Sequence, residues 1–378
     1  MKSDNSYVFR FYIFYLIHLY KEGVLLMSIV IKGREKFIID RTLINISQNS
    51  IYENRLHENG LQEFIVNLTK IGVDFFEVDE ATFNYVRHLM LPAVFIFRIE
   101  KISQLEICSR SGIEYIIVKE EDFSLVKNYL IKENYNFKII LEVDIKSTTS
   151  NYIKEINKNI DINELFCVRI RGEGNWRYDD YISGNFDIKT NMYASDEFNM
   201  ATAVGFQAII SGFDYVNTSF CGYDEIYGTT ALEELLVAIK IIVGAKVNGD
   251  ISLLREIRKQ YEKITSTKLP SNKPVVGNNI FKYESGVHVA GIEKNPMTYE
   301  PFNPEIVGMQ RKLALGKHSG HNSISSKLKE LGIDNEFTDT QIAIILEEIK
   351  NKSIANKTEL CDKDFIEICR EVKRPDYV

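Results

Sequence analysis

The sequence predicts an α/β protein built from a (β/α)8 TIM barrel, a linker subdomain and a small helical subdomain. Short runs of β-branched and aromatic residues alternate with amphipathic segments eight times within about 200 residues, the length typical of such a barrel. The turn after the first strand, KFIIDRTL at 36–43, has no glycine, whereas an open doubly wound sheet usually has a glycine-rich first turn. The alternation gives way to a Pro/Gly/Asn-rich stretch at 269–279, so a different structure follows there.

Each predicted strand is followed by a helical segment, because parallel strands that follow one another in the chain need helical crossovers. The predicted strands are residues 36–43, 74–80, 94–100, 114–120, 138–145, 164–172, 187–195 and 214–222. Amphipathic helical segments include residues 61–72, 103–112, 123–134 and 200–212, and a further helix is predicted at 231–244. The rival open sheet has little support, since GEG at 172–174 is too short for a dinucleotide-binding fingerprint.

The part of the chain beyond the barrel is predicted to be irregular at first and helical at its end. Residues 280–320 contain three of the seven prolines. Thr338 and Gln341 have the spacing of a capping box, which predicts the start of a helix, and a second helix follows with an apolar face. We therefore divide the chain into an N-terminal extension (1–33), a barrel (34–268), a linker or lid (269–330) and a helical subdomain (331–378).

Composition and charge exclude several classes of protein. The chain of 378 residues has 45% hydrophobic and 26% charged residues, ordinary globular values, and a formal net charge of −7 with no basic run, which argues against nucleic-acid binding. The five cysteines form no CxxC pair, so they indicate reduced thiols in a cytoplasmic protein rather than disulfides or a zinc knuckle. They are Cys108, Cys167, Cys221, Cys361 and Cys369.

Residues 7–31 are rich in aromatic and aliphatic side chains, but several polar residues and a glycine interrupt them, so we predict neither a membrane helix nor a signal peptide. Met27 opens a more conventional start. We interpret residues 1–26 as lying upstream of the true start or as dispensable, the alternative being an apolar helix that docks on a partner or a membrane surface.

Residues 273–320, KPVVGNNIFKYESGVHVAGIEKNPMTYEPFNPEIVGMQRKLALGKHSG, carry a resemblance to a known family. This long ungapped segment resembles the post-barrel region of the homocitrate synthase and isopropylmalate synthase family. The barrel is similar to that family as well, from IIDRTL at 38–43 to CGYDEIYGTTALEEL at 221–235. The chain stops without the large regulatory domain of isopropylmalate synthases, which favours the short homocitrate synthase form found with nitrogen fixation.

The resemblance implies a Claisen condensation of acetyl-CoA with a 2-oxo acid, 2-oxoglutarate in homocitrate synthases. In that family a divalent cation bound by an Asp, two His and an Asn acts as a Lewis acid on the keto oxygen, and an Arg lies beside the Asp. This sequence departs from the pattern at all these positions, so we predict that the chain binds no catalytic metal of its own. Ile44 stands at the Arg position, and the four ligand positions hold Asn45, Tyr193, Ser195 and Cys221.

Other family positions are kept. Gln48 and Glu77 match residues near the family's substrate, and we predict that both contact substrate, although Glu77 could also be a residual feature. His288 and Tyr299 match the post-barrel histidine and tyrosine implicated in catalysis, as a proton-transfer group and its positioning hydroxyl. The alternative for His288 is a purely structural role, which we favour for His318.

The barrel lacks the family's metal ligands, whereas the family's post-barrel residues are retained, which suggests that this chain supplies only part of an active site. We expect this chain to be a subunit that pairs with an alpha-type homocitrate synthase chain, or with itself, so that acetyl-CoA and the oxo acid meet at a shared site. The partner chain would hold the divalent metal, and this chain would contribute post-barrel residues and a scaffold. Two alternatives remain open: a noncatalytic regulatory or scaffold pseudoenzyme, and a self-sufficient citramalate or isopropylmalate synthase. A lyase of the related barrel family is a weaker third, since it needs the same metal.

Overall fold

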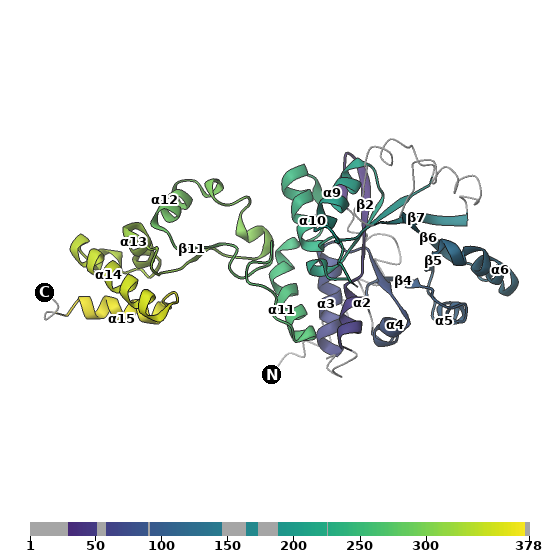
Figure 1. The fold of residues 1–378 in the computed structure, drawn as a ribbon, viewed down its shortest axis with the longest axis horizontal. Helices are drawn as coiled ribbons and strands as arrows, with labels where there is room; N and C mark the ends of the chain where they lie inside the picture. Colours follow the sequence, from purple (N-terminus) through teal and green to yellow (C-terminus); the bar gives the residue numbers. More distant parts are fainter. Residues whose placement is uncertain are drawn as a thin grey trace, which may run out of the picture. The chain divides into compact units, whose positions relative to one another are not determined.

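The computed structural model describes residues 29–50, 58–89, 91–145, 164–172, 188–224 and 226–374, and Figure 1 shows its fold. Most of the N-terminal extension therefore lies outside the described residues. The chain divides into two compact units, residues 1–268 and 269–378, which are described separately below.

Eight parallel strands form a closed barrel in the first unit. β2 (Arg34–Asp40) pairs with β3 (Phe75–Val78) on one side and with β9 (Tyr215–Thr218) on the other, and this second pairing closes the sheet. The strands between them follow the order of the chain: β4 (Val94–Arg98), β5 (Tyr115–Lys119), β6 (Lys138–Ile145), β7 (Leu165–Gly172) and β8 (Thr190–Ala194). Each strand overlaps one of the eight predicted segments, so the predicted barrel is confirmed.

Helices cover the outside of the barrel (Figure 1). They are α2 (Thr42–Ser50), α3 (Glu58–Ile71), α4 (Glu80–Val86), α5 (Gln104–Arg110), α6 (Phe123–Glu133), α9 (Ala201–Ser211), α10 (Leu232–Ala238) and α11 (Leu254–Thr265). The helices predicted from periodicity are confirmed, with one difference: the segment predicted as a helix at 231–244 continues α10 as a π-helical turn, η4 (Ile239–Val243).

Two short strands of the first unit were not predicted. β1 (Ile29–Ile31) forms an antiparallel hairpin with β2 and pairs on its other edge with β10 (Lys246–Val247). Segments of two and three residues are too short to show a period of two, so the sequence carries no signal for them. β1 lies within residues 1–33, the predicted N-terminal extension, and its hydrogen bonds join the end of that segment to β2.

The second unit begins with irregular chain and ends in three helices. β11 (Lys282–Tyr283) pairs in parallel with β12 (Lys312–Leu313), and between them lie α12 (Gly286–Lys294) and the short helices η6 (Pro296–Thr298) and η7 (Pro304–Val307). The later helices are α13 (His321–Glu330), α14 (Asp339–Asn356) and α15 (Asp362–Val372). The predicted capping box is confirmed, because the Thr338 side chain accepts from the Gln341 backbone and the Gln341 side chain accepts from the Thr338 backbone.

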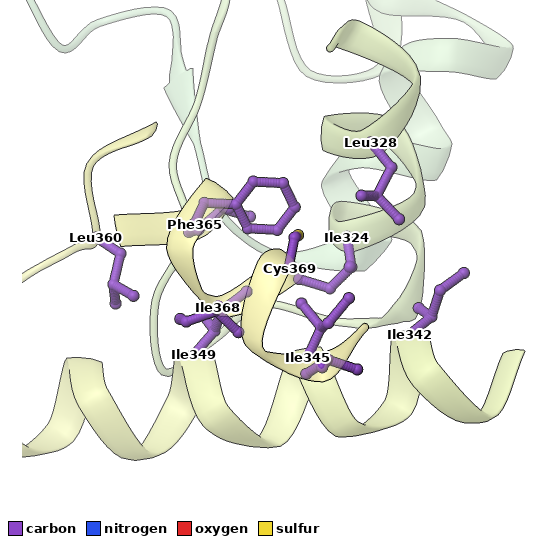
Figure 2. Packing of buried hydrophobic residues seen from close by; sticks show 11 residues of the cluster. Ile324, Leu328, Ile342, Ile345, Ile349, Leu360, Phe365, Ile368 and Cys369 are labelled. Carbon is purple, nitrogen blue, oxygen red and sulfur yellow. The ribbon is translucent and has the colours of Figure 1, made fainter. Parts of the chain in front are cut away.

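These three helices pack around an apolar core of their own (Figure 2). Ile345 and Ile349 of α14 face Phe365 and Ile368 of α15, and all four side chains are essentially buried. The core is completed by Leu315, Ile324, Leu328, Ile342, Leu360, Cys369 and Val372. The spacing of three and four residues that predicted α14 and α15 is therefore the spacing that buries one face of each, whereas α13 had not been predicted.

Candidate functional site

The inside of the barrel is filled by side chains in layers, because alternate residues of a strand face the same side. Aromatic rings fill the first layer, with centroids 4.9 to 6.4 Å apart in neighbouring pairs. They belong to Phe37, Phe75, Tyr115, Phe166 and Tyr215. Ile39, Ile96, Ile117, Ile140 and Cys167 fill the next layer. The barrel is thus a packed core up to its carboxyl-terminal half.

Beyond the aliphatic layer, towards the carboxyl ends of the strands, the interior becomes charged. Six buried side chains form what we call the interior charge cluster: Arg41, Glu77, Arg98, Glu142, Arg169 and Asp224. Most of them stand two residues after an interior apolar residue, as strand alternation requires. Of these six residues, only Glu77 had been singled out from the sequence. Charged residues at inward positions of buried strands, such as Arg98, Glu142 and Arg169, were the available signal.

Glu77 is the centre of this cluster. Its two oxygens accept from Arg41, from Arg98 Nε at 3.1 Å and from Arg169 Nη1 at 2.7 Å. Burial alone would raise the pKa of Glu77, but the guanidinium groups of Arg169, Arg41 and Arg98 outweigh it and hold that pKa well below its ordinary value. Glu77 is therefore a fully enclosed carboxylate whose charged form the three arginines stabilise.

Glu142 and Asp224 complete the pairing of the arginines. Both oxygens of Glu142 accept from Arg98, at 2.8 and 2.7 Å. Both oxygens of Asp224 accept from Arg41, from Nε at 2.9 Å and from Nη2 at 3.3 Å. Bidentate ion pairs between arginine and a carboxylate are the strongest kind, and they depend closely on geometry.

The residues at the four family ligand positions have different surroundings. Tyr193 donates its hydroxyl to Asp224 Oδ2 at 2.6 Å, and its ring lies 4.8 Å from the Arg41 guanidinium carbon. The Asn45 amide oxygen accepts from the Tyr261 hydroxyl of α11 at 3.3 Å. Cys221 is buried in a left-handed backbone conformation, and its backbone N–H donates to Glu233. Ser195 is half-buried at the end of β8.

This arrangement does not fit a divalent cation. The four positions offer an amide, a phenol, a hydroxyl and a thiol, a poor donor set for Mg²⁺, Mn²⁺ or Zn²⁺. Within the described residues, no group of three or more His, Cys, Asp or Glu side chains is placed to hold a metal ion. The positive charge at this point of the barrel is the guanidinium of Arg41, which lies between Glu77 and Asp224 and against the ring of Tyr193.

The two predicted substrate contacts lie in different surroundings. Glu77 is enclosed by the arginines, whereas Gln48 is exposed near the end of α2. Ile44, at the family's Arg position, is buried. His88 is exposed just after α4, and His18 and His57 lie outside the described residues. Contact of Gln48 and Glu77 with substrate remains a prediction.

In the second unit, His288 and Tyr299 lie together. His288 is on α12, Tyr299 directly follows η6, and their ring centroids are 4.6 Å apart with planes tilted by 55°. Both side chains are exposed. The sequence named both residues but could not show that they touch, since eleven positions and a turn separate them. Their arrangement suits a histidine that moves a proton while a neighbouring phenol orients it.

Glu284 accepts two hydrogen bonds from the GKHSG run and the start of α13. The backbone N–H of His318 donates to Glu284 Oε1 at 2.7 Å, and the hydroxyl of Ser323 donates to the Glu284 carbonyl at 2.8 Å. These contacts tie the beginning of α13 to the chain just before α12. The contact of His318 involves only its backbone, so the structural role favoured for its side chain stays a prediction.

Comparison with known proteins gives a consistent result. Residues 275–357 match the family described as "Homocitrate synthase post-HMGL domain-like". The chain is 34% identical to the homocitrate synthase omega subunit of Clostridium pasteurianum over 92% of this chain and 99% of that protein. It is 39% identical to the homocitrate synthase AksA of Methanothermobacter thermautotrophicus over 50% of this chain and 48% of that protein. The 2-isopropylmalate synthase 2 of Caldanaerobacter subterraneus is 35% identical over 49% of this chain and 48% of that protein.

None of the described helices is both long enough and apolar enough to cross a membrane.

Proposed function

Because the chain belongs to the homocitrate synthase family of acyltransferases, we propose that it is a homocitrate synthase subunit that works only with a partner chain. The observation that carries this proposal is the position of Arg41. Its guanidinium, and not a set of metal ligands, lies among Glu77, Asp224 and Tyr193. Within the described residues of the barrel, no group of His, Cys, Asp and Glu side chains is placed to hold the Lewis acid that family members use, which supports the need for a partner.

The proposed partner is an alpha-type homocitrate synthase chain with an intact barrel and a divalent metal. The similarity to a protein named as an omega subunit supports a complex of this kind. A self-dimer of this chain would not serve, because both barrels would carry the same residues at the ligand positions. The barrel of this chain would then act as a scaffold, since a fold can persist after its chemistry is lost.

In the proposed reaction, a methyl proton of acetyl-CoA is removed and the carbon attacks the keto carbon of 2-oxoglutarate. The keto oxygen takes up a proton to become a hydroxyl group, and water then hydrolyses the thioester and releases CoA. His288 would transfer a proton at one of these steps, and Tyr299 would orient its imidazole or the attacking water. The exposure of both rings supports this role, because a group donated to another chain must be reachable from outside.

The test is an assay of this chain alone, of the alpha-type chain alone and of the two together, with acetyl-CoA and 2-oxoglutarate. We expect condensation from the mixture and none from this chain alone. In the mixture, His288→Gln should lower the rate by roughly 10²- to 10⁴-fold, the usual contribution of general acid–base catalysis. His321→Gln is the matched control, because His321 is an exposed histidine of the same unit and should leave the rate unchanged.

Two outcomes would contradict the proposal. Metal-dependent condensation by this chain alone would show that its barrel is catalytic after all. Equal rates for the mixtures that contain wild-type and His288→Gln chains would show that this residue is not donated, and would favour a scaffold or regulatory role.

A further inference from the structure

The contact between His288 and Tyr299 is held by features that no sequence motif explains. His288 and Gly291 are three residues apart on α12 and therefore share one face of the helix. The ring of Tyr299 lies on this face, 4.6 Å from the His288 ring between centroids. Tyr299 is 45% exposed, so burial alone does not hold its ring in place.

Gly291 makes room for the Tyr299 ring. A Cβ atom at this position would lie 2.3 Å from Tyr299 Cε2, which is far too close, and 3.1 Å from Cδ2, which is a tight contact. Gly291 lies within α12, where glycine costs about 0.5–1 kcal/mol relative to alanine. The helix therefore carries a weak helix former at the one turn against which this ring packs.

The backbone on both sides of Tyr299 is fixed as well. The N–H groups of Tyr299 and Glu300 both donate to the Pro296 carbonyl, at 3.1 and 3.0 Å. The Glu300 carboxylate, 6% exposed, accepts from Arg311 Nε at 2.8 Å and from Arg311 Nη2 at 2.7 Å. Arg311 directly precedes β12, so the residue after Tyr299 is fastened to the small sheet formed by β11 and β12.

We propose that Gly291 and the Glu300–Arg311 ion pair are positioning elements that hold the Tyr299 ring against His288. The ion pair sets where the backbone of Tyr299 lies, and Gly291 leaves the space into which its ring turns. The effect of these residues on catalysis rests on the proposed function, whereas their effect on the position of the Tyr299 ring can be tested in this chain alone.

The first test is proton NMR of the full chain without a partner. A tyrosine ring at this distance shifts the imidazole protons of His288, which are assigned with His288→Gln, and Tyr299→Leu gives the value without the ring. We expect Gly291→Ala and Arg311→Met each to move the His288 signals most of the way to that value. Gly60→Ala is the matched control, because Gly60 is also in a helix and its nearest neighbour to an added Cβ is Ile264 at 3.8 Å.

The His318 and His321 signals show whether the second unit is still folded. Unchanged His318 and His321 signals together with an unshifted His288 in Gly291→Ala would overturn the proposal. If Arg311→Met fails to fold, Gly291→Ala still tests the proposal, because the exposed Tyr299 ring can move away from the added methyl group without unfolding the unit.

The second test is kinetic and uses the complex. We expect Gly291→Ala and Arg311→Met to lower kcat by roughly 10- to 100-fold, as small misplacements of catalytic groups do, with little change in KM for acetyl-CoA. A change in KM alone would contradict positioning of a catalytic group. If His288→Gln itself leaves the rate unchanged, the proposed function fails, but the NMR result still decides whether these residues hold the ring.

Discussion

Replacing Arg41 with methionine should reveal how much the barrel depends on its internal cation. Methionine replaces the aliphatic part of the arginine side chain and removes the guanidinium. The two oxygens of Asp224 lose the donors at 2.9 and 3.3 Å, and Glu77 loses one of its three arginine partners. Arg41 is 1% exposed, so water cannot replace these bonds without opening the barrel.

Removing one partner of a buried ion pair typically costs about 3–5 kcal/mol, because the remaining charge is left uncompensated. Glu77 keeps Arg98 and Arg169, and Asp224 keeps the Tyr193 hydroxyl, so we expect a loss near the lower end of this range in the free energy of unfolding. Arg110→Met is the matched control. Arg110 is 78% exposed and pairs with Glu106 one helical turn away, a type of pair that contributes about 0–1 kcal/mol.

Hydrogen exchange measured by mass spectrometry suits this comparison, because peptides from β3 and β9 report on the barrel separately from the second unit. The opening free energy of these peptides should fall in Arg41→Met and stay unchanged in Arg110→Met. If the opening free energies of these peptides were equal in the two variants, the ion pairs of Arg41 would stabilise the barrel no more than a surface ion pair does. The reasoning from the burial of Arg41 would then be wrong.

Three further changes test other parts of the structure. Tyr193→Phe removes the 2.6 Å hydrogen bond to Asp224 and should lower the free energy of unfolding by about 1.5–3 kcal/mol, measured by urea denaturation. Burial raises the pKa of Asp74 to about 8, so the folded chain keeps a proton that the unfolded chain releases near pH 4. The free energy of unfolding should therefore fall as the pH rises from about 4 to about 8. Asp74→Asn retains an oxygen for the Ile38 N–H and should flatten this pH dependence, which urea midpoints at several pH values would show; an unchanged slope would contradict the assignment. Thr338→Ala removes the N-cap of α14 and should cost about 1 kcal/mol, read from the exchange of α14 amides, with no effect on barrel peptides.

The comparison of sequence and structure separates local signals from long-range ones. The eight barrel strands and the helix that begins after Thr338 were predictable, because their signals are periods of two or 3.6 residues and a cap four residues long. β1 and β10 were not, because three and two residues define no period and their pairing joins positions more than two hundred residues apart.

The candidate site divides in the same way. The sequence showed that the family's ligand positions hold Asn45, Tyr193, Ser195 and Cys221, but it did not show what takes the place of the ligands. Arg41 had been noted only as part of the first strand. Its bond to Asp224 spans 183 positions, and such a contact is set by the closure of the barrel between β2 and β9.

The amino-acid sequence alone determined the barrel, the helical end of the chain, its likeness to the homocitrate synthases and the identity of His288 and Tyr299 as residues to examine. Periodicity and motif letters suffice for these, since each is written in neighbouring positions. The tertiary structure decided that three arginines enclose Glu77, that Arg41 binds Asp224 beside Tyr193, and that the His288 and Tyr299 rings meet over Gly291. These are contacts between side chains brought together by strand closure and by a turn, and their free energy depends on burial and direction, which no linear pattern records.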